Sequence, residues 1–238
     1  MERFNILRWL VERFGLPKSW AGPCEHIVMA IFALVIILAA SLLAWRKLRH
    51  TEGRLVPEER GSLANIFEVV VEGLLRMLED VMGSAGRRHL PLIAALFVYI
   101  LVCNLMGVIP GLTPPTDNIN TNLACALVVF VYYNVAGIRA QGVKKYLKHM
   151  AGPIIWLAPL MFSIELISHL VRPVSLSVRL FGNITGDHMV LGIFSQLTPL
   201  LVPVIFQALA IFVAFIQAFV FTLLSVVYIT LASGAEER

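Results

Sequence analysis

The stretch SLSVRLFGNITGDH, Ser175–His188, places an arginine in the middle of a long apolar segment. A guanidinium stays protonated at physiological pH, so Arg179 cannot lose its charge when it enters a surrounding of low polarity. On insertion scales, an arginine at the centre of a bilayer costs at least ~2.5–3.5 kcal/mol. A compensating interaction is therefore expected, either within this chain or on another molecule.

The whole chain has the composition of a membrane protein. Of its 238 residues, 58% are hydrophobic and 14% are charged, whereas soluble domains carry about 25% charged residues. Its basic residues gather at the ends of apolar segments, which is typical of membrane-protein loops and does not indicate nucleic-acid binding. Cys24, Cys103 and Cys125 lack the spacing of a metal motif. We therefore expect these cysteines to serve as small apolar side chains in packed helices, and we expect no metal or other cofactor.

Apolar segments of about 20 residues predict membrane-spanning helices. We expect an all-α integral membrane protein that forms one domain over residues 1–238. The expected spans cover residues 27–45, 90–112, 123–138, 154–184 and 204–231. Two further segments are amphipathic: residues 1–25 are expected on the membrane surface, and residues 62–82 form an interfacial helix. Glu72 and Arg76 make an expected i,i+4 pair on its polar side.

Loops rich in Lys and Arg alternate along the chain with loops that contain none. The basic loops are 46–60, 87–88 and 139–148, and the others are 110–122 and 186–203. With five spans, this alternation places the amino end outside and the carboxyl end in the cytoplasm. It also predicts an outward-facing turn at Asp187 and His188. The expected location is a bacterial inner membrane.

Polar side chains recur at helical spacing through the fourth expected span. On an α-helix they fall within about 80° of one another, and most other residues of that helix are apolar. The members of this polar stripe are Glu165, His169, Arg172, Arg179, Asn183 and Asp187. Lipid does not tolerate such a face, so the stripe must meet protein or water. Pro173 predicts a kink or an unwound turn at its midpoint.

Several of these residues also have a purely structural interpretation. Glu165 and Arg172 could form an interfacial ion pair, and His169 could make an interhelical hydrogen bond instead of relaying protons. Arg179 could extend its side chain to a membrane surface, but no span end lies close to it. On the last span, Gln217 could hydrogen-bond a guanidinium, a water or another helix.

Two motifs resemble those of one family of membrane proteins. RPVSLSVRLFGNITGDH (172–188) and FIQAFVFTLLSVVYITLA (215–232) are similar to the a subunit of F-type ATP synthases, the stationary proton-channel subunit of the membrane sector. The resemblance covers most of the chain and implies that the last two spans form a long, tilted hairpin against a ring of c subunits. It also implies b subunits and the rest of the ATP synthase as partners. No nucleotide site and no enzymatic activity are then expected in this chain alone.

The resemblance assigns roles to individual residues. Arg179 matches the family's essential arginine, which faces the ion-carrying carboxylate of the c-ring. A fixed guanidinium lowers the pKa of that carboxylate and repels protons that would otherwise cross directly. Glu165 lies where the family places an acid on the inner half-channel. The expected proton path comprises Glu165, His169, Ser175, Asn183, Asp187, His188 and Gln217.

The outer end of this path departs from the family pattern. His188 occupies a position that holds Glu or His in the family, and imidazole changes charge near neutral pH. Its usual ionisable partner on the last span is replaced by Ala210. Asp187 or Gln207 would then have to compensate.

Two other functions fit the sequence less well. A stand-alone secondary transporter could use the polar stripe to bind an anionic substrate, but transporters commonly show inverted repeats and more spans. An intramembrane hydrolase would need a nucleophile–base pair or a metal motif such as HExxH, which this sequence lacks. The choice between H⁺ and Na⁺ as the coupled ion stays open, because the discriminating ligands would lie on the partner subunit.

Overall fold

The computed structural model of the protein describes residues 24–49, 63–109, 111–144, 157–197 and 201–233, together with positions 13, 22 and 146. In this part of the chain all regular structure is helical, which confirms the all-α expectation. Five apolar stretches are long enough to cross a membrane, as expected. The chain divides between Pro115 and Thr116 into two compact units. The predicted surface segment 1–25 lies almost wholly outside the described residues.

The first unit is built around two apolar helices. Its elements are α2 (Glu25–Arg49), α3 (Leu63–Met82), the 3₁₀ segment η2 (Gly83–His89) and α4 (Leu90–Met106). α2 packs against α4 through a small core of Met29, Ala33, Cys103 and Met106. α4 ends before the expected boundary at 112, because Gly107 caps the helix and Pro110 cannot continue it.

α3 is amphipathic, as predicted for residues 62–82. Leu74 and Leu78 on one side are buried, whereas Nη2 of Arg76 lies 2.6 Å from Oε1 of Glu72 on the exposed side. The expected i,i+4 pair is therefore present. η2 folds back closely onto this helix, because a Cβ at Gly86 would lie only 2.7 Å from the carbonyl oxygen of Leu78.

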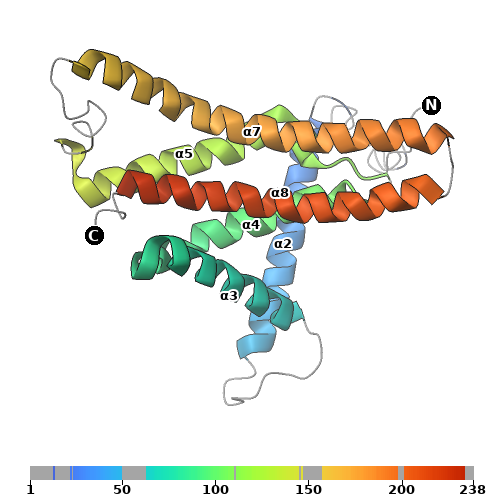
Figure 1. The fold of residues 1–238 in the computed structure, drawn as a ribbon. Coiled ribbons are helices and arrows are strands. Elements are labelled where there is room, and N and C mark those ends of the chain that lie inside the picture. The colour runs from blue at the N-terminus through green and yellow to red at the C-terminus, as the bar shows by residue number, and fades with distance from the viewer. Residues whose placement is uncertain are drawn as a thin grey trace. The chain divides into compact units, whose positions relative to one another are not determined.

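The second unit contains the two longest helices. Its elements are the 3₁₀ turn η3 (Pro115–Asp117), α5 (Ile119–Gln141), α7 (Ala158–Leu197) and α8 (Leu201–Ser233). Figure 1 shows α7 and α8 side by side along this unit, with α5 packed against both. The last two spans thus form the long hairpin that the resemblance implies. Its core includes Leu176, Leu180, Ala214 and Phe221.

The ends and packing of α5 follow from a few residues. The Asn118 side chain caps the helix by accepting a hydrogen bond from the backbone N–H of Asn120 at 2.9 Å. Gly142, with φ of +79°, ends it. A Cβ at Gly137 would lie 2.7 Å from both the Ala232 carbonyl oxygen and Cε2 of Tyr146. Only glycine permits this approach of α5 to α8.

For α7, the unwound turn that was one alternative at Pro173 is absent, and the turn expected at Asp187 and His188 is wrong. The helix runs without interruption through Pro173, and it includes Asp187 and His188 instead of turning there. A backbone in lipid has no water to bond, which favours a continuous helix even across a proline. Near the end, apolar residues continue at helical spacing as far as Phe194, and the next proline is Pro199. Nothing in the sequence therefore stops the helix at residue 184.

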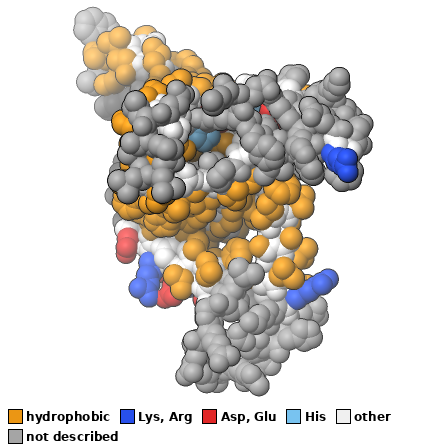
Figure 2. Space-filling model, turned by 90° about the vertical axis from the view of Figure 1, so that its right-hand side faces the viewer, with side chains coloured by type: hydrophobic (Ala, Val, Ile, Leu, Met, Phe, Trp, Pro, Cys, Tyr) orange, Lys and Arg blue, Asp and Glu red, His pale blue; other side chains and the backbone are white. Residues whose placement is uncertain are grey.

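The surface of the described residues is that of a membrane protein. Figure 2 shows a face on which most described side chains are hydrophobic. On α8, for example, Phe212 is 61% exposed and Phe215 is 50% exposed. Apolar exposure on this scale is rare in soluble monomers and fits contact with lipid or with another membrane subunit.

Candidate functional site

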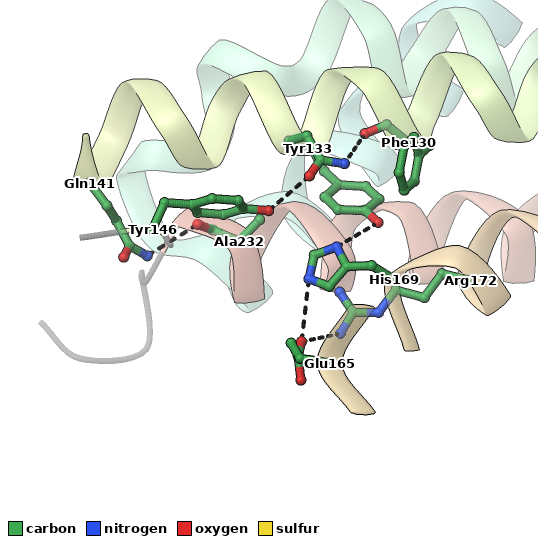
Figure 3. Close-up of polar contacts among 9 residues, drawn as sticks. Phe130, Tyr133, Gln141, Tyr146, Glu165, His169, Arg172 and Ala232 are labelled. Atoms are coloured by element: carbon green, nitrogen blue, oxygen red, sulfur yellow. Dashed lines mark hydrogen bonds and ion pairs between the residues drawn. The ribbon is translucent and has the colours of Figure 1, made fainter. Parts of the chain in front are cut away.

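The first turns of the polar stripe form a compact ionic group on α7. His169 is 7% exposed, and its Nε2 lies 3.3 Å from Oε1 of Glu165. Nη2 of Arg172 lies 3.6 Å from the same oxygen. Because these residues are separated by three, four and seven positions, one helical face brings them together (Figure 3). The ion pair that the sequence allowed as an alternative for Glu165 and Arg172 is present.

Aromatic residues of α5 and α8 enclose this group. The Tyr133 hydroxyl lies 3.1 Å from Nδ1 of His169, so the interhelical hydrogen bond expected as one alternative is also present. The guanidinium carbon of Arg172 is 6.0 Å from the Tyr133 ring centroid and 5.2 Å from that of Tyr228, within the range of cation–π attraction. We call Tyr133, Glu165, His169, Arg172 and Tyr228 the tyrosine–histidine cluster.

Tyr146 packs beside this cluster without belonging to its hydrogen bonds. Its ring lies edge-on to the His169 ring, with 6.5 Å between centroids. Its hydroxyl donates to Oδ1 of Asn134 at 2.9 Å (Figure 3). Burial raises the pKa of the Tyr146 phenol, so it stays protonated at neutral pH. Sequence reasoning selected neither Tyr133 nor Tyr146. The sequence did offer one signal for them: each is an aromatic residue that carries a hydroxyl group, and they lie in and just after an expected span.

Arg179 stands apart from the clusters around it. Its side chain is exposed, and within the described part of the chain it has no ion pair or hydrogen bond. Ser175, one turn earlier, is exposed as well. A Cβ at Gly182 or Gly186 would meet no atom of the described residues within 4 Å, so these residues leave this side of α7 open. The expected compensation for the Arg179 charge is therefore not found among the described residues.

Asn183 and Gln217 join α7 to α8 one turn beyond Arg179. Nδ2 of Asn183 donates to Oε1 of Gln217 at 2.6 Å, which is the helix–helix contact that the sequence left open for Gln217. The glutamine is only 3% exposed, and its Nε2 has no hydrogen-bond partner among the described residues. Gln217 thus presents a buried N–H donor close to the open side of α7.

A third polar group links the far end of α7 to the turn before α5. Nδ1 of His188 lies 3.7 Å from Oδ2 of Asp117, and the Thr185 hydroxyl donates to the other carboxylate oxygen at 3.0 Å. Sequence reasoning named Asp187 or Gln207 as the compensating group and missed Asp117. The available signal was that Asp117 is the only acidic residue between Asp80 and Glu165. We call Asp117, Thr185 and His188 the aspartate–histidine group.

The polar stripe is therefore divided into three parts along one helix. His169 and Arg172 contact α5 and α8 and pair with Glu165 on their own helix. Arg179 is exposed. Asn183 contacts α8, and His188, beside the end of the stripe, contacts η3. Asp187, half-buried, lies beside His188. Among the described residues, no group of three His, Cys, Asp or Glu side chains could hold a metal ion.

These features define a class: an all-α membrane protein whose longest span carries an exposed arginine between two ionisable clusters. The family model for the ATP synthase A chain matches residues 27–230. ATP synthase subunit a 1 of Syntrophotalea carbinolica is 46% identical over 240 residues, which is 99% of this chain and 97% of that protein. ATP synthase subunit a of Geobacter sulfurreducens is 48% identical over 94% of this chain and 93% of its own length. ATP synthase subunit a of Trichlorobacter lovleyi is 50% identical over 85% of this chain and 84% of its own length. The chain belongs to the ATP synthase A chain family.

Proposed function

We propose that this chain is the stationary proton-channel subunit of an F-type ATP synthase, which couples proton flow to rotation of a c-ring and so to ATP synthesis. The observation that carries the proposal is Arg179, an exposed charge on a membrane-embedded helix without a partner in the described chain. Such a charge requires an opposite charge on another molecule. A carboxylate on each c subunit supplies that charge, and the chain needs these partners to function.

The surroundings of Arg179 support contact with a passing helix. Val174 and Val178 beside it are about half exposed, at 52% and 49%, and no side chain of the described residues covers Gly182. Small residues allow close helix approach in membranes. A c-ring carboxylate that reaches Arg179 has its pKa lowered by the fixed charge and releases its proton. The same charge bars protons from crossing directly between the two half-channels.

The aspartate–histidine group is assigned to the outer half-channel. Asp117 belongs to the 110–122 connection, which has no Lys or Arg and is therefore expected outside. A proton passes from there by His188, beside Asp187, towards Asn183 and Gln217. The Gln217 side-chain N–H, which has no partner among the described residues, is a donor for water on this route.

The tyrosine–histidine cluster is assigned to the inner half-channel. α5 ends near it, and the basic residues that follow α5 in the 139–148 loop are expected in the cytoplasm. Glu165 and His169 are the groups that can hold the proton, and Ser175 lies between them and Arg179. Arg172 keeps its charge and balances the Glu165 carboxylate.

The location follows from the same assignment. We place the chain in a bacterial inner membrane, with its amino end outside and its carboxyl end in the cytoplasm, bound to the c-ring and to b subunits of the peripheral stalk. On its own the chain is a channel component without enzymatic activity. A stand-alone transporter gains no support from the relatives, which are named ATP synthase subunits.

The test compares Arg179→Ala with wild type in vesicles that contain this chain together with its c-ring and b subunits. ATP-driven proton pumping is expected to disappear, while passive proton conduction persists or rises because the barrier has gone. Arg139→Ala is the matched control, because Arg139 is also an exposed arginine but lies at the end of α5; it should pump normally. Pumping by the Arg179→Ala complex would refute the proposal.

A further inference from the structure

The hydrogen bonds of His169 impose an order on its protons. An ionised carboxylate only accepts hydrogen bonds, so Nε2 of His169 carries a hydrogen when it faces ionised Glu165. A neutral imidazole has a single N–H, and its Nδ1 is then an acceptor. The Tyr133 hydroxyl, 3.1 Å away, must donate to it. In this state the donors run from Tyr133 through His169 to Glu165 (Figure 3).

The same contact also serves the charged imidazole. With two protons, both ring nitrogens donate, and the Tyr133 oxygen turns from donor to acceptor. A hydroxyl can play both parts, whereas a phenyl ring can play neither. His169 is 7% exposed and Tyr133 1%, so water has little room to replace a lost partner. A buried ring nitrogen without a partner would cost about 1–3 kcal/mol.

We infer that Tyr133 is a positioning residue of the inner proton path, which keeps Nδ1 of His169 hydrogen-bonded in both protonation states and so holds Nε2 towards Glu165. The inference rests on the proposed function. It names a residue that neither the sequence motifs nor the family resemblance selects.

The other polar groups near His169 have different roles. Glu165 and Arg172 face it from its own helix, and Tyr228 reaches it only through Arg172. Tyr146 packs edge-on against the ring but gives its hydroxyl to Asn134. Both tyrosines pack against His169, but only the Tyr133 hydroxyl is hydrogen-bonded to its ring. This difference makes Tyr146 a matched control.

The experiment measures ATP-driven pumping and passive proton conduction by the assembled complex in vesicles, as a function of pH on the inner side. Rates are divided by the amount of assembled complex. Tyr133→Phe is expected to lower conduction about threefold to tenfold, the effect of one lost hydrogen bond on a rate, and to displace the pH profile. Tyr146→Phe should keep both the rate and the profile of wild type.

A second background separates positioning from packing. In complexes carrying His169→Gln, Tyr133→Phe should cause no further loss, because its effect passes through the imidazole. An equal loss in both backgrounds, or an unchanged rate and pH profile in the wild-type background, would overturn the inference. The Arg179→Ala test of the proposed function is independent of both results.

A second pair of variants covers the case in which Tyr133→Phe assembles poorly. Tyr133→Gln keeps a group that can donate and accept hydrogen bonds. The leucine of Tyr133→Leu is similar in size to glutamine but can do neither. The glutamine variant is expected to conduct several times faster than the leucine variant. Equal rates for the two would overturn the inference.

Discussion

The carboxylate of Asp117 lies 3.7 Å from the His188 imidazole and accepts a hydrogen bond from Thr185, so one acid from the turn before α5 holds two residues of α7. The Asp117 carboxylate gives His188 an acidic partner, which Ala210 on α8 cannot provide. The family pattern places an ionisable partner for His188 on the last span; here the acid comes from a different element. Under the proposed function, the acidic partner of His188 in the outer half-channel is therefore on η3 and not on α8.

Replacing Asp117 should impair proton entry more than replacing Asp187, the acid that the sequence analysis proposed for the same role. We expect Asp117→Asn to lower ATP-driven pumping about tenfold, equivalent to 1.4 kcal/mol, because the His188 imidazole loses the carboxylate that it contacts. Asp187→Asn should cost less. The measurement is the pumping rate of vesicles against outer pH.

An exchange of the two residues tests whether the pair itself matters. Asp117→His combined with His188→Asp restores an acid and an imidazole at the same contact, and should recover part of the lost rate. A double variant no better than Asp117→Asn would contradict a paired role. A larger defect in Asp187→Asn than in Asp117→Asn would return the assignment to Asp187.

Two glycines should respond differently to the same added methyl group. Gly137→Ala forces a Cβ to within 2.7 Å of the Ala232 backbone, and overpacking of this kind costs about 1–3 kcal/mol. This exceeds the gain of about 1 kcal/mol from replacing glycine in a helix. We expect a lower dissociation temperature of the purified complex and less subunit in the membrane.

The methyl group added by Gly182→Ala meets no atom of the described residues within 4 Å. This substitution should leave the folded subunit as stable as wild type and reduce pumping, because the added methyl group lies on the side assigned to the c-ring. Normal pumping by Gly182→Ala would argue that this side of α7 faces lipid. The comparison needs both the amount of subunit in the membrane and the pumping rate.

The Asn183–Gln217 hydrogen bond should show the asymmetry of a buried amide. Asn183→Ala leaves the Gln217 amide buried without the partner that it has among the described residues, at a cost of about 1–3 kcal/mol. Adding Gln217→Leu removes the stranded polar group and should return most of the stability. Thermal dissociation of the solubilised complex measures both variants; a double variant no more stable than Asn183→Ala would contradict this expectation.

Arg172→Lys keeps the charge but changes its shape. A compact ammonium can still pair with Glu165, whereas it lacks the planar, delocalised face that a guanidinium presents to the nearby Tyr133 and Tyr228 rings. We expect a loss of about 0.5–2 kcal/mol in the stability of the complex. Arg76→Lys is the control, because the Arg76 side chain is 74% exposed in its pair with Glu72 and such pairs contribute little. Equal losses in both variants would exclude a special role for the rings.

Local patterns in the sequence predicted many of the contacts in the candidate site. The 3.6-residue period placed Glu165, His169 and Arg172 on one face, and the structure finds them in contact. The same period paired Glu72 with Arg76. Both predictions succeeded because neighbours on one helix are fixed by backbone geometry alone. The turn expected at Asp187 is absent, because the apolar residues that follow it continue the helix across the glycines and polar residues.

The sequence by itself determined that this is an all-helical membrane protein, that α7 carries a charged stripe, and that Arg179 needs a partner. Hydrophobic length and helical period are properties of contiguous residues, so no tertiary information was required. Only the tertiary structure decided that Tyr133 bonds His169, that Asp117 reaches His188, and that Arg179 remains exposed. These contacts join residues 36 and more positions apart, and they depend on how α5, α7 and α8 pack, which no local pattern encodes.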